Sequence, residues 1–248
     1  MHQADTLLAD WEALGWPFHT PPRLLRRLPG GLTNRSFLIE ADAERWVMRI
    51  DSPHSKTLGI DRVREQALLR HAADAGLAPA LLCADAERGY QITAYIEGQH
   101  LNPAVLAVHQ QTALFELFER VHALPIEGAP IDYLRSDDQA DGNTVTGVLT
   151  ELRAEIESLS TQSDAGLCHH DPVPGNVIFT ETKLYLIDWE YAGRGLPVID
   201  WAALACEWQL PLAAIGEVSG YAEPVLAQAE RSYRTLCHVW QERIARLP

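Results

Sequence analysis

The sequence has very few lysines: only Lys56 and Lys183 occur among its 248 residues. Arginine supplies the rest of the 20 basic residues, which face 34 acidic ones, so the formal net charge is −14. A chain with this shortage of positive charge has no excess of cations to displace the counterions of a nucleic-acid backbone. We therefore expect no nucleic acid among its partners.

Cysteine is also sparse, and long hydrophobic runs are missing. No two of the four cysteines are spaced as CxxC, which argues against a zinc site and fits reduced thiols in a cytoplasmic protein. The first residues, MHQADTLLADWEALGWPF, carry acidic side chains early and no long apolar run, so we expect neither a signal peptide nor a membrane span. The sequence gives no sign of an obligate protein partner. The cysteines are Cys83, Cys168, Cys206 and Cys237.

The acidic residues are concentrated in the second part of the chain. Residues 1–98 hold 11 basic and 13 acidic residues, a net charge of −2, whereas residues 99–248 hold 9 and 21, a net charge of −12. This excess can serve solubility alone. It can also attract a cationic small molecule, and the sequence leaves both interpretations open.

The first 98 residues follow a pattern of strands, one helix and further strands. Apolar and polar residues alternate in RWVMRI, which predicts two strands around a turn at Asp42–Glu44. A helix is expected over 59–76, where the pattern stops at Gly76 before Pro79. Its apolar residues Ile60, Val63, Ala67 and Leu68 recur at helical spacing, and the other expected elements are a helix over 4–15 and strands within 79–85 and 89–98.

Beyond residue 98 the pattern becomes mostly helical. Helices are expected over 103–124 and 142–160, and the polar stretch Asp137–Gly142 predicts a mobile loop before the second one. A hairpin-like insert over 167–188 interrupts the helices, which resume near Trp201.

These patterns predict an α+β protein with two lobes. The first, over residues 1–94, is an antiparallel β-rich lobe with one helix. A short connector at 95–98 joins it to a mostly α-helical lobe over 99–248.

The insert opens with LCHHDPVPGNVIF, residues 167–179, whose polar residues invite a chemical interpretation. His169 and His170 are neighbours that point to opposite faces of an extended chain, so they cannot easily share a metal ion. The sequence also lacks the Gly-x-Ser-x-Gly elbow of a serine hydrolase. Zinc binding and nucleophilic catalysis are therefore weak interpretations of this segment.

Three side chains with oxygen atoms offer a better interpretation. Asn176 stands five residues after Asp171, and Asp188 ends the strand of the insert. Carboxylate and amide oxygens are the ligands that Mg²⁺ prefers. The order His-x-Asp-x-x-x-x-Asn, followed by a strand that ends in Asp, is the arrangement of kinases. The pattern predicts Asp171 as the catalytic residue and Asn176 and Asp188 as magnesium ligands.

The segments HHDPVPGN and LYLIDWEYAG resemble the catalytic loop and metal motif of the aminoglycoside phosphotransferase and choline kinase superfamily, which has a protein-kinase-like fold. The family pattern is usually H-[GN]-D-x-x-x-x-N, then [IL]-D-[FW]-[GE]. The resemblance covers about residues 28–208. It implies that His169 supports the loop and that Asp200, in VIDWA, braces it through backbone hydrogen bonds. His170 departs from the usual Gly or Asn, which leaves its role open.

The same resemblance implies a site for ATP in the first lobe. Arg49 stands where the family has the cation for the phosphates, and Glu65 is the helix carboxylate that would hold it. The turn GGLTN would cover the phosphates with backbone N–H groups, although it lacks both the G-x-G-x-x-G and the P-loop patterns. The connector would contact adenine. The residues concerned are Gly30, Gly31, Thr33 and Asn34 in the turn and Tyr95, Ile96 and Glu97 in the connector.

The substrate implied by the resemblance is a small cationic alcohol. DWEY and GGLTN look most like bacterial choline kinases, and IDWEYAG also looks like thiamine kinase. A quaternary ammonium group binds to aromatic faces and nearby carboxylates, and both occur after Asp188. The candidate substrate residues are Glu190, Tyr191, Glu207 and Trp208.

Several alternatives stay open at this point. Thiamine kinase is the nearest, followed by an aminoglycoside or sugar phosphotransferase. A kinase-like protein without activity that binds a nucleotide or a partner is a different class. The presence of Asp171, Asn176 and Asp188 argues against it, because a binding protein has no chemical need for all three.

Overall fold

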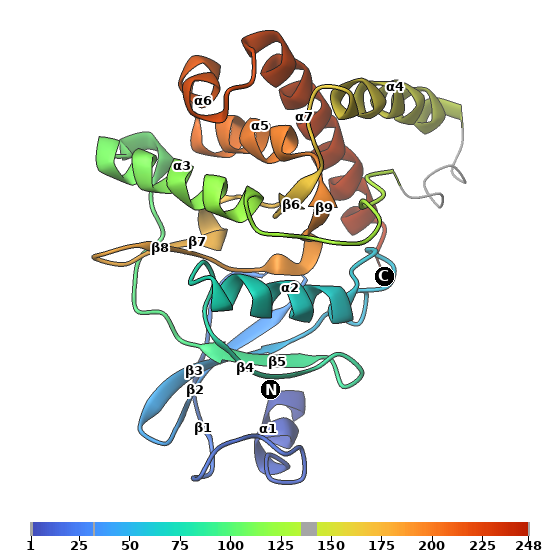
Figure 1. Ribbon diagram of the computed structural model, residues 1–248. Helices are drawn as coiled ribbons and strands as arrows, with labels where there is room; N and C mark the ends of the chain where they lie inside the picture. The colour runs from blue at the N-terminus through green and yellow to red at the C-terminus, as the bar shows by residue number, and fades with distance from the viewer. Residues whose placement is uncertain (1, 32, 135–142, 248) are drawn as a thin grey trace. The chain divides into compact units, whose positions relative to one another are not determined.

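The computed structural model describes residues 2–31, 33–134 and 143–247, so the loop predicted at Asp137–Gly142 lies outside the described residues. The chain forms two compact units, one of Met1–Gln99 with Ile178–Glu190 and the other of His100–Val177 with Tyr191–Pro248 (Figure 1). The predicted lobes divide the chain at one connector. The first unit, in contrast, includes a segment from much later in the sequence.

The first unit is built on an antiparallel sheet of five strands in the order β1-β2-β3-β5-β4 (Figure 1). Neighbouring strands are joined by short turns, except where helix α2 lies in the chain between β3 and β5. The strands are β1 (Arg23–Arg27), β2 (Arg35–Ala41), β3 (Glu44–Ile50), β4 (Leu81–Asp85) and β5 (Tyr90–Ala94).

The hairpin of β2 and β3 follows the predicted alternation. Phe37 pairs with Met48, and both are buried. The turn consists of Asp42 and Ala43, with φ angles of 53° and 62°, the left-handed conformation that matches the twist of a two-residue hairpin. The two predicted strands and their turn are therefore confirmed.

Helix α2 (Arg62–Asp74) begins at the cap residue Asp61, whose side chain accepts a hydrogen bond from the backbone N–H of Arg64. Its buried side is not the apolar stripe that the sequence suggested, because Val63 is 68% exposed. The buried residues are Arg62, Glu65, Leu69 and Ala72. Two charged side chains thus lie on the inner side of the helix, which is possible only where they meet opposite charges.

The hydrophobic core of the first unit lies against the sheet. Helix α1 (His2–Ala9) and the turns that follow it pack there, with Trp16 in contact with Phe18 and Tyr90. The hairpin of β7 (Val177–Phe179) and β8 (Leu184–Leu186) also joins this unit. The backbone N–H of Leu186 donates to the carbonyl of Leu77 over 2.8 Å. This contact helps to fix the chain just before Asp188.

The second unit is mainly helical. Its small sheet pairs β6 (Gly166–Cys168) with β9 (Gly193–Gly195), and these two strands flank the segment that contains Asp171, Asn176 and Asp188. Leu152 of α4 and Val239 of α7 share a core cluster. The helices are α3 (Val108–His122), α4 (Asn143–Ser160), α5 (Pro197–Trp208), α6 (Leu212–Ser219) and α7 (Glu223–Ala245).

Several helix boundaries differ from those predicted. The helix expected over 4–15 ends at Ala9, and the chain continues in turns. The helix expected over 103–124 is a 3-10 turn, η1 (Pro103–Val105), followed by α3. Helices resume at Pro197 rather than near Trp201, because proline is favoured in the first turn of a helix.

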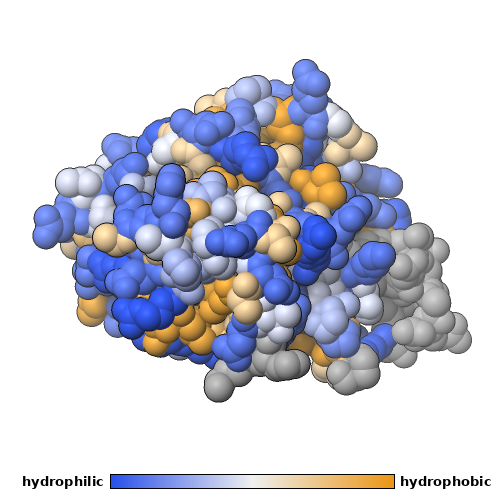
Figure 2. Space-filling model, turned by 90° about the horizontal axis from the view of Figure 1, so that it is seen from below, coloured by the Kyte–Doolittle hydropathy of each residue, from blue (hydrophilic) through white to orange (hydrophobic). Residues whose placement is uncertain are grey.

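Hydrophilic residues cover most of the face in Figure 2, and hydrophobic residues gather in a few groups. None of the helices in the described part of the chain combines the length and apolar character that crossing a bilayer requires. All four cysteines are free thiols.

Candidate active site

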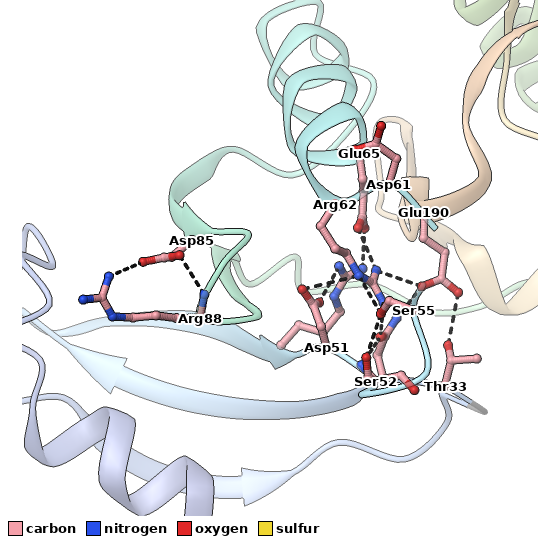
Figure 3. Close-up of polar contacts among 12 residues, drawn as sticks. Thr33, Asp51, Ser52, Ser55, Asp61, Arg62, Glu65, Asp85, Arg88 and Glu190 are labelled. Atoms are coloured by element: carbon pink, nitrogen blue, oxygen red, sulfur yellow. Dashed lines mark hydrogen bonds and ion pairs between the residues drawn. The ribbon is translucent and has the colours of Figure 1, made fainter. Parts of the chain in front are cut away.

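Arg49, near the end of β3, belongs to an ionic cluster in the first unit, whose members Asp51, Arg62, Glu65 and Glu190 are labelled in Figure 3. Its guanidinium contacts Glu65 Oε1 at 2.6 Å, Asp51 Oδ1 at 2.9 Å and Asp188 Oδ1 at 3.1 Å. Burial alone would lower the pKa of Arg49, but these carboxylates outweigh it and raise the pKa above its ordinary value. The structure thus brings together Arg49, Glu65 and Asp188, which the sequence had predicted from three separate segments.

Arg62 is a second buried cation in the same cluster, and the sequence analysis missed it. Its Nη1 lies 2.7 Å from Glu65 Oε2 and 3.0 Å from Glu190 Oε2, and its Nη2 donates to Asn34 Oδ1 over 2.8 Å. The spacing of three residues between Arg62 and Glu65 in DRVRE could have indicated the pair, because side chains at i and i+3 share one face of a helix.

The cluster contains more negative than positive charge. Two arginines face the carboxylates of Asp51, Glu65, Asp188 and Glu190, so these six side chains sum to −2. At Asp51, burial outweighs the nearby arginines and raises the pKa of the carboxyl group. At Glu65, the arginines outweigh burial and lower the pKa. A divalent cation beside the most exposed of the four, Asp188, would balance this charge.

Two side chains of the glycine-rich turn donate hydrogen bonds to Glu190, which stands two positions after Asp188. Asn34 Nδ2 donates to Glu190 Oε2 over 2.7 Å, and Thr33 Oγ1 donates to Glu190 Oε1 over 3.1 Å. Gly31 has a φ of 78°, and a Cβ there would come within 2.5 Å of the carbonyl oxygen of Asn34, so only glycine fits. Gly30 has a φ of 89° in open space.

Glu190 was predicted to bind the substrate, and this packing argues against that role. Its side chain is only 4% exposed, and both carboxylate oxygens accept hydrogen bonds from residues of the first unit. A carboxylate held by Arg62, Asn34 and Thr33 holds the fold of its own unit together.

The predicted adenine-binding connector follows β5. The Arg45 guanidinium lies 4.9 Å from the centre of the Tyr95 ring and pairs with Glu97 at 2.7 Å. The backbone N–H of Tyr95 donates to the carbonyl of Arg45 over 3.1 Å. Contact of Tyr95, Ile96 and Glu97 with adenine stays a prediction.

The loop predicted to be catalytic belongs to the second unit, where Asp171 and Asn176 are in contact. Asn176 Nδ2 donates to Asp171 Oδ2 over 2.7 Å and to the Asp171 carbonyl over 2.9 Å. The short 3-10 helix η3 (Pro174–Asn176) turns the chain back so that this contact forms. Because the amide nitrogen of Asn176 faces Asp171, its oxygen is the atom that suits a hard cation.

Asp200 lies under this loop. Its Oδ2 accepts from the backbone N–H of His169 over 2.7 Å, and its Oδ1 from that of His170 over 2.8 Å. His122 Nε2 lies 3.2 Å from Oδ2. Burial would raise the pKa of Asp200, but these partners outweigh it and lower the pKa to about 2. The buried His169 also accepts from the backbone N–H of Asp171 at Nδ1, over 3.3 Å.

The remaining predicted substrate residues also belong to the second unit. Glu207 Oε1 accepts from the Tyr233 hydroxyl over 3.0 Å, and Asp171 is near enough to act electrostatically on Tyr233. The Tyr191 hydroxyl accepts from Trp240 Nε1 over 2.6 Å. Tyr233 and Trp240, both on α7, were missed because they lie beyond the last recognised segment, which ends at Trp208.

Trp208 has no exposed surface, and its Nε1 donates to the carbonyl of Pro172 over 2.7 Å. A ring without exposed surface offers no face to a ligand, so this packing argues against the predicted role of Trp208 in binding a cation. It instead supports the loop directly after Asp171.

The model of the phosphotransferase enzyme family matches residues 24–236, which is most of the chain. The chain belongs to this family. Membership confirms the resemblance that the sequence motifs indicated. It also makes the chain a member of a family of kinase-type phosphotransferases.

Two relatives, both named Protein LicA, come from Haemophilus influenzae. One is 25% identical over 196 residues, which cover 73% of this chain and 57% of the relative. The other, from strain KW20 / Rd, is 24% identical over 194 residues, which cover 72% of each. The chain therefore spans only part of the length of these relatives.

Solved structures share the fold at low sequence identity. Choline kinase LicA from Streptococcus pneumoniae is 22% identical, with a TM-score of 0.70 over 98% of this chain and 92% of that one. A LicA complex with AMP is 21% identical, with a TM-score of 0.75 over 97% of this chain and 90% of that one. An aminoglycoside phosphotransferase with AMP-PNP and hygromycin B is 16% identical, with a TM-score of 0.63 over 94% of this chain and 91% of that one. The expected α+β, protein-kinase-like fold is confirmed.

Proposed function

We propose that the protein transfers the γ-phosphoryl group of ATP to the hydroxyl of a small cationic alcohol of the choline or ethanolamine type. The observation that carries this proposal is the contact between Asp171 and Asn176 in the second unit, together with the hydrogen bond from the Tyr233 hydroxyl to Glu207 over 3.0 Å. Burial raises the pKa of Tyr233 and of Cys237, one turn further along α7, and the negative charges of Glu207 and Asp171 raise both further.

This group has the chemistry that a quaternary ammonium ion requires. Asp171 and Glu207 supply negative charge, and Tyr233 supplies an aromatic ring beside Glu207. The Tyr191–Trp240 pair offers two further aromatic rings in the same unit. Arg234, a neighbouring cation, is exposed and paired with Glu230 at 2.7 Å. The charge of −12 over residues 99–248 adds a longer-range attraction for a cation.

In the proposed reaction, the Asp171 carboxylate accepts a hydrogen bond from the substrate hydroxyl. The substrate oxygen forms a bond to the γ-phosphorus while the bond from that phosphorus to the β,γ-bridging oxygen breaks. ADP leaves with the electron pair of that bond, and the hydroxyl proton passes to Asp171. The hydrogen bond from Asn176 holds the carboxylate for this step.

The residues present fit magnesium, which would neutralise the phosphate oxygens when bound. Asp188 belongs to a cluster with two unbalanced negative charges, and Asn176 directs its amide nitrogen to Asp171. We propose Asn176 and Asp188 as the ligands. Arg49, held by Glu65, is the proposed partner of the ATP phosphates.

A substrate panel tests the proposal. Purified protein with ATP and Mg²⁺ is assayed for ADP release with choline, ethanolamine, thiamine and an aminoglycoside, with Asp171→Asn as the control. We expect turnover of choline or ethanolamine that the substitution removes. Preference for thiamine or an aminoglycoside would replace the proposed substrate, and no turnover with any of the four would favour a binding protein.

A further inference from the structure

His170, the residue directly before Asp171, has a φ of 67°. Residues that carry a side chain rarely adopt this left-handed backbone conformation, which glycine and asparagine tolerate best. The usual Gly or Asn of the family motif at this position therefore suits the backbone. Histidine fits this conformation less well than glycine, so its presence here indicates that the side chain contributes something in return.

The His170 ring makes two directed hydrogen bonds. Nδ1 lies 3.1 Å from the carbonyl oxygen of Tyr191, and Nε2 lies 3.0 Å from the hydroxyl of Tyr133. A carbonyl only accepts, so Nδ1 carries a proton and donates to Tyr191, while Nε2 shares a hydrogen bond with the Tyr133 hydroxyl. The Tyr133 hydroxyl in turn accepts from the backbone N–H of Leu196 over 2.9 Å.

Two further features support this arrangement. Burial raises the pKa of Tyr133 well above its ordinary value, so its hydroxyl stays protonated. Gly195 leaves the space that the two rings occupy, because a Cβ there would come within 2.6 Å of the Tyr133 hydroxyl and within 2.7 Å of His170 Cε1. The rings of Tyr133 and His170 meet edge to face, with centroids 5.3 Å apart.

The contact with Tyr191 leads to helix α7. The Tyr191 hydroxyl accepts from Trp240 Nε1, and their rings are nearly perpendicular, with centroids 6.2 Å apart. One chain of contacts therefore runs from the residue before Asp171, through Tyr191, to an aromatic side chain of α7.

We propose that His170 is a positioning residue that holds the Tyr191–Trp240 pair in place for the cationic end of the substrate. The identity of that ligand rests on the proposed function. The hydrogen bond from His170 Nδ1 to the Tyr191 carbonyl is called the tie below. The backbone at residue 170 does not need histidine, so His170→Asn and His170→Gly remove the tie and fit the loop at least as well.

The experiment compares these two variants with Ala43→Gly. Ala43 is exposed, has a φ of 62° and lies in the β2–β3 turn, so this control relieves the same kind of strain without touching the tie. The KM values for choline and ATP are measured, together with the hydrogen-exchange rate of the Trp240 indole N–H by NMR. The indole signal is assigned from its loss in Trp240→Phe.

We expect both His170 variants to raise the KM for choline about tenfold, to leave the KM for ATP within about twofold, and to speed indole exchange about tenfold. The control changes none of these. An unchanged KM for choline, or a changed KM without faster exchange, would overturn the proposal. If the wild-type protein phosphorylates no alcohol, the proposed function fails. Indole exchange then decides the role of His170 alone: acceleration supports the tie and an unchanged rate overturns it.

Discussion

Glu190 accepts a hydrogen bond from Asn34 Nδ2 over 2.7 Å, although the two residues are 156 positions apart in the chain. This contact joins the glycine-rich turn to the segment that carries Asp188, within the first unit. Glu190 Oε2 also forms an ion pair with Arg62 Nη1, at 3.0 Å. Glu190, the third residue of the DWE motif, thus contacts residues of its own unit, whereas the sequence predicted that it binds the substrate.

Glu190→Gln tests this role. Loss of the charge leaves Arg62 with one fewer buried partner and sets an amide against the donors Asn34 and Thr33, so we expect the free energy of unfolding to fall by about 3 kcal/mol. The KM for choline should change no more than that for ATP. Urea unfolding and steady-state kinetics provide the two readouts.

The matched control is Glu97→Gln, since Glu97 pairs with Arg45 at 2.7 Å but is mostly exposed. Its effect should stay within about 0.5 kcal/mol. A selective rise in the KM for choline in Glu190→Gln, without a loss of stability, would restore the original interpretation of Glu190 as a substrate residue.

Arg49→Met removes the cation that faces three carboxylates. We expect kcat/KM to fall between about 10²- and 10³-fold, because Arg49 is the proposed partner of the ATP phosphates. Arg23→Met, on β1 at an exposed ion pair with Glu40, is the control and should retain activity. Equal effects of the two substitutions would remove Arg49 from the nucleotide site.

Trp208→Phe separates support of the catalytic loop from contact with the substrate. Loss of the indole N–H leaves the Pro172 carbonyl without this partner and opens a small cavity, which should destabilise the protein by about 2–4 kcal/mol. If Trp208 supports the loop, kcat falls while the KM for choline holds. A raised KM with kcat intact would instead identify Trp208 as part of the cation site.

Asp200 links stability to pH. Its pKa in the folded protein, about 2, lies below the ordinary value of 3.8, so its contribution is complete above about pH 4 and is lost as the pH falls through 2. The shift corresponds to about 2 kcal/mol. The gap in unfolding free energy between wild type and Asp200→Asn should therefore narrow by about that amount between pH 5 and pH 2. A constant gap across this range would show that the Asp200 charge does not stabilise the fold.

The sequence predicted the elements of this fold well because their signals are local. The alternation in RWVMRI and the turn at Asp42 gave the β2–β3 hairpin, and helical spacing gave α4 close to its observed bounds. The buried side of α2 could not be predicted in this way. The resemblance to the kinase family placed Glu65 beside Arg49, but Arg62 resembles a surface charge until Glu190, from a distant segment, lies beside it.

The candidate site was predicted as far as its motifs extend. The contact between Asp171 and Asn176 follows from a spacing of five residues and a proline-rich turn. Tyr233 and Trp240 have no motif of their own, since an aromatic residue on an amphipathic helix resembles any core residue. Tyr133 lies on a loop far from the motif, and its contact with His170 depends on the absence of a side chain at Gly195.

The central claim is that Asp171 receives the proton of a cationic alcohol during phosphoryl transfer. The most direct test is turnover of choline by wild type and Asp171→Asn, with ATP binding measured in parallel by calorimetry. We predict a loss of kcat between about 10²- and 10⁴-fold with nearly unchanged ATP affinity. Full turnover by Asp171→Asn would contradict the account.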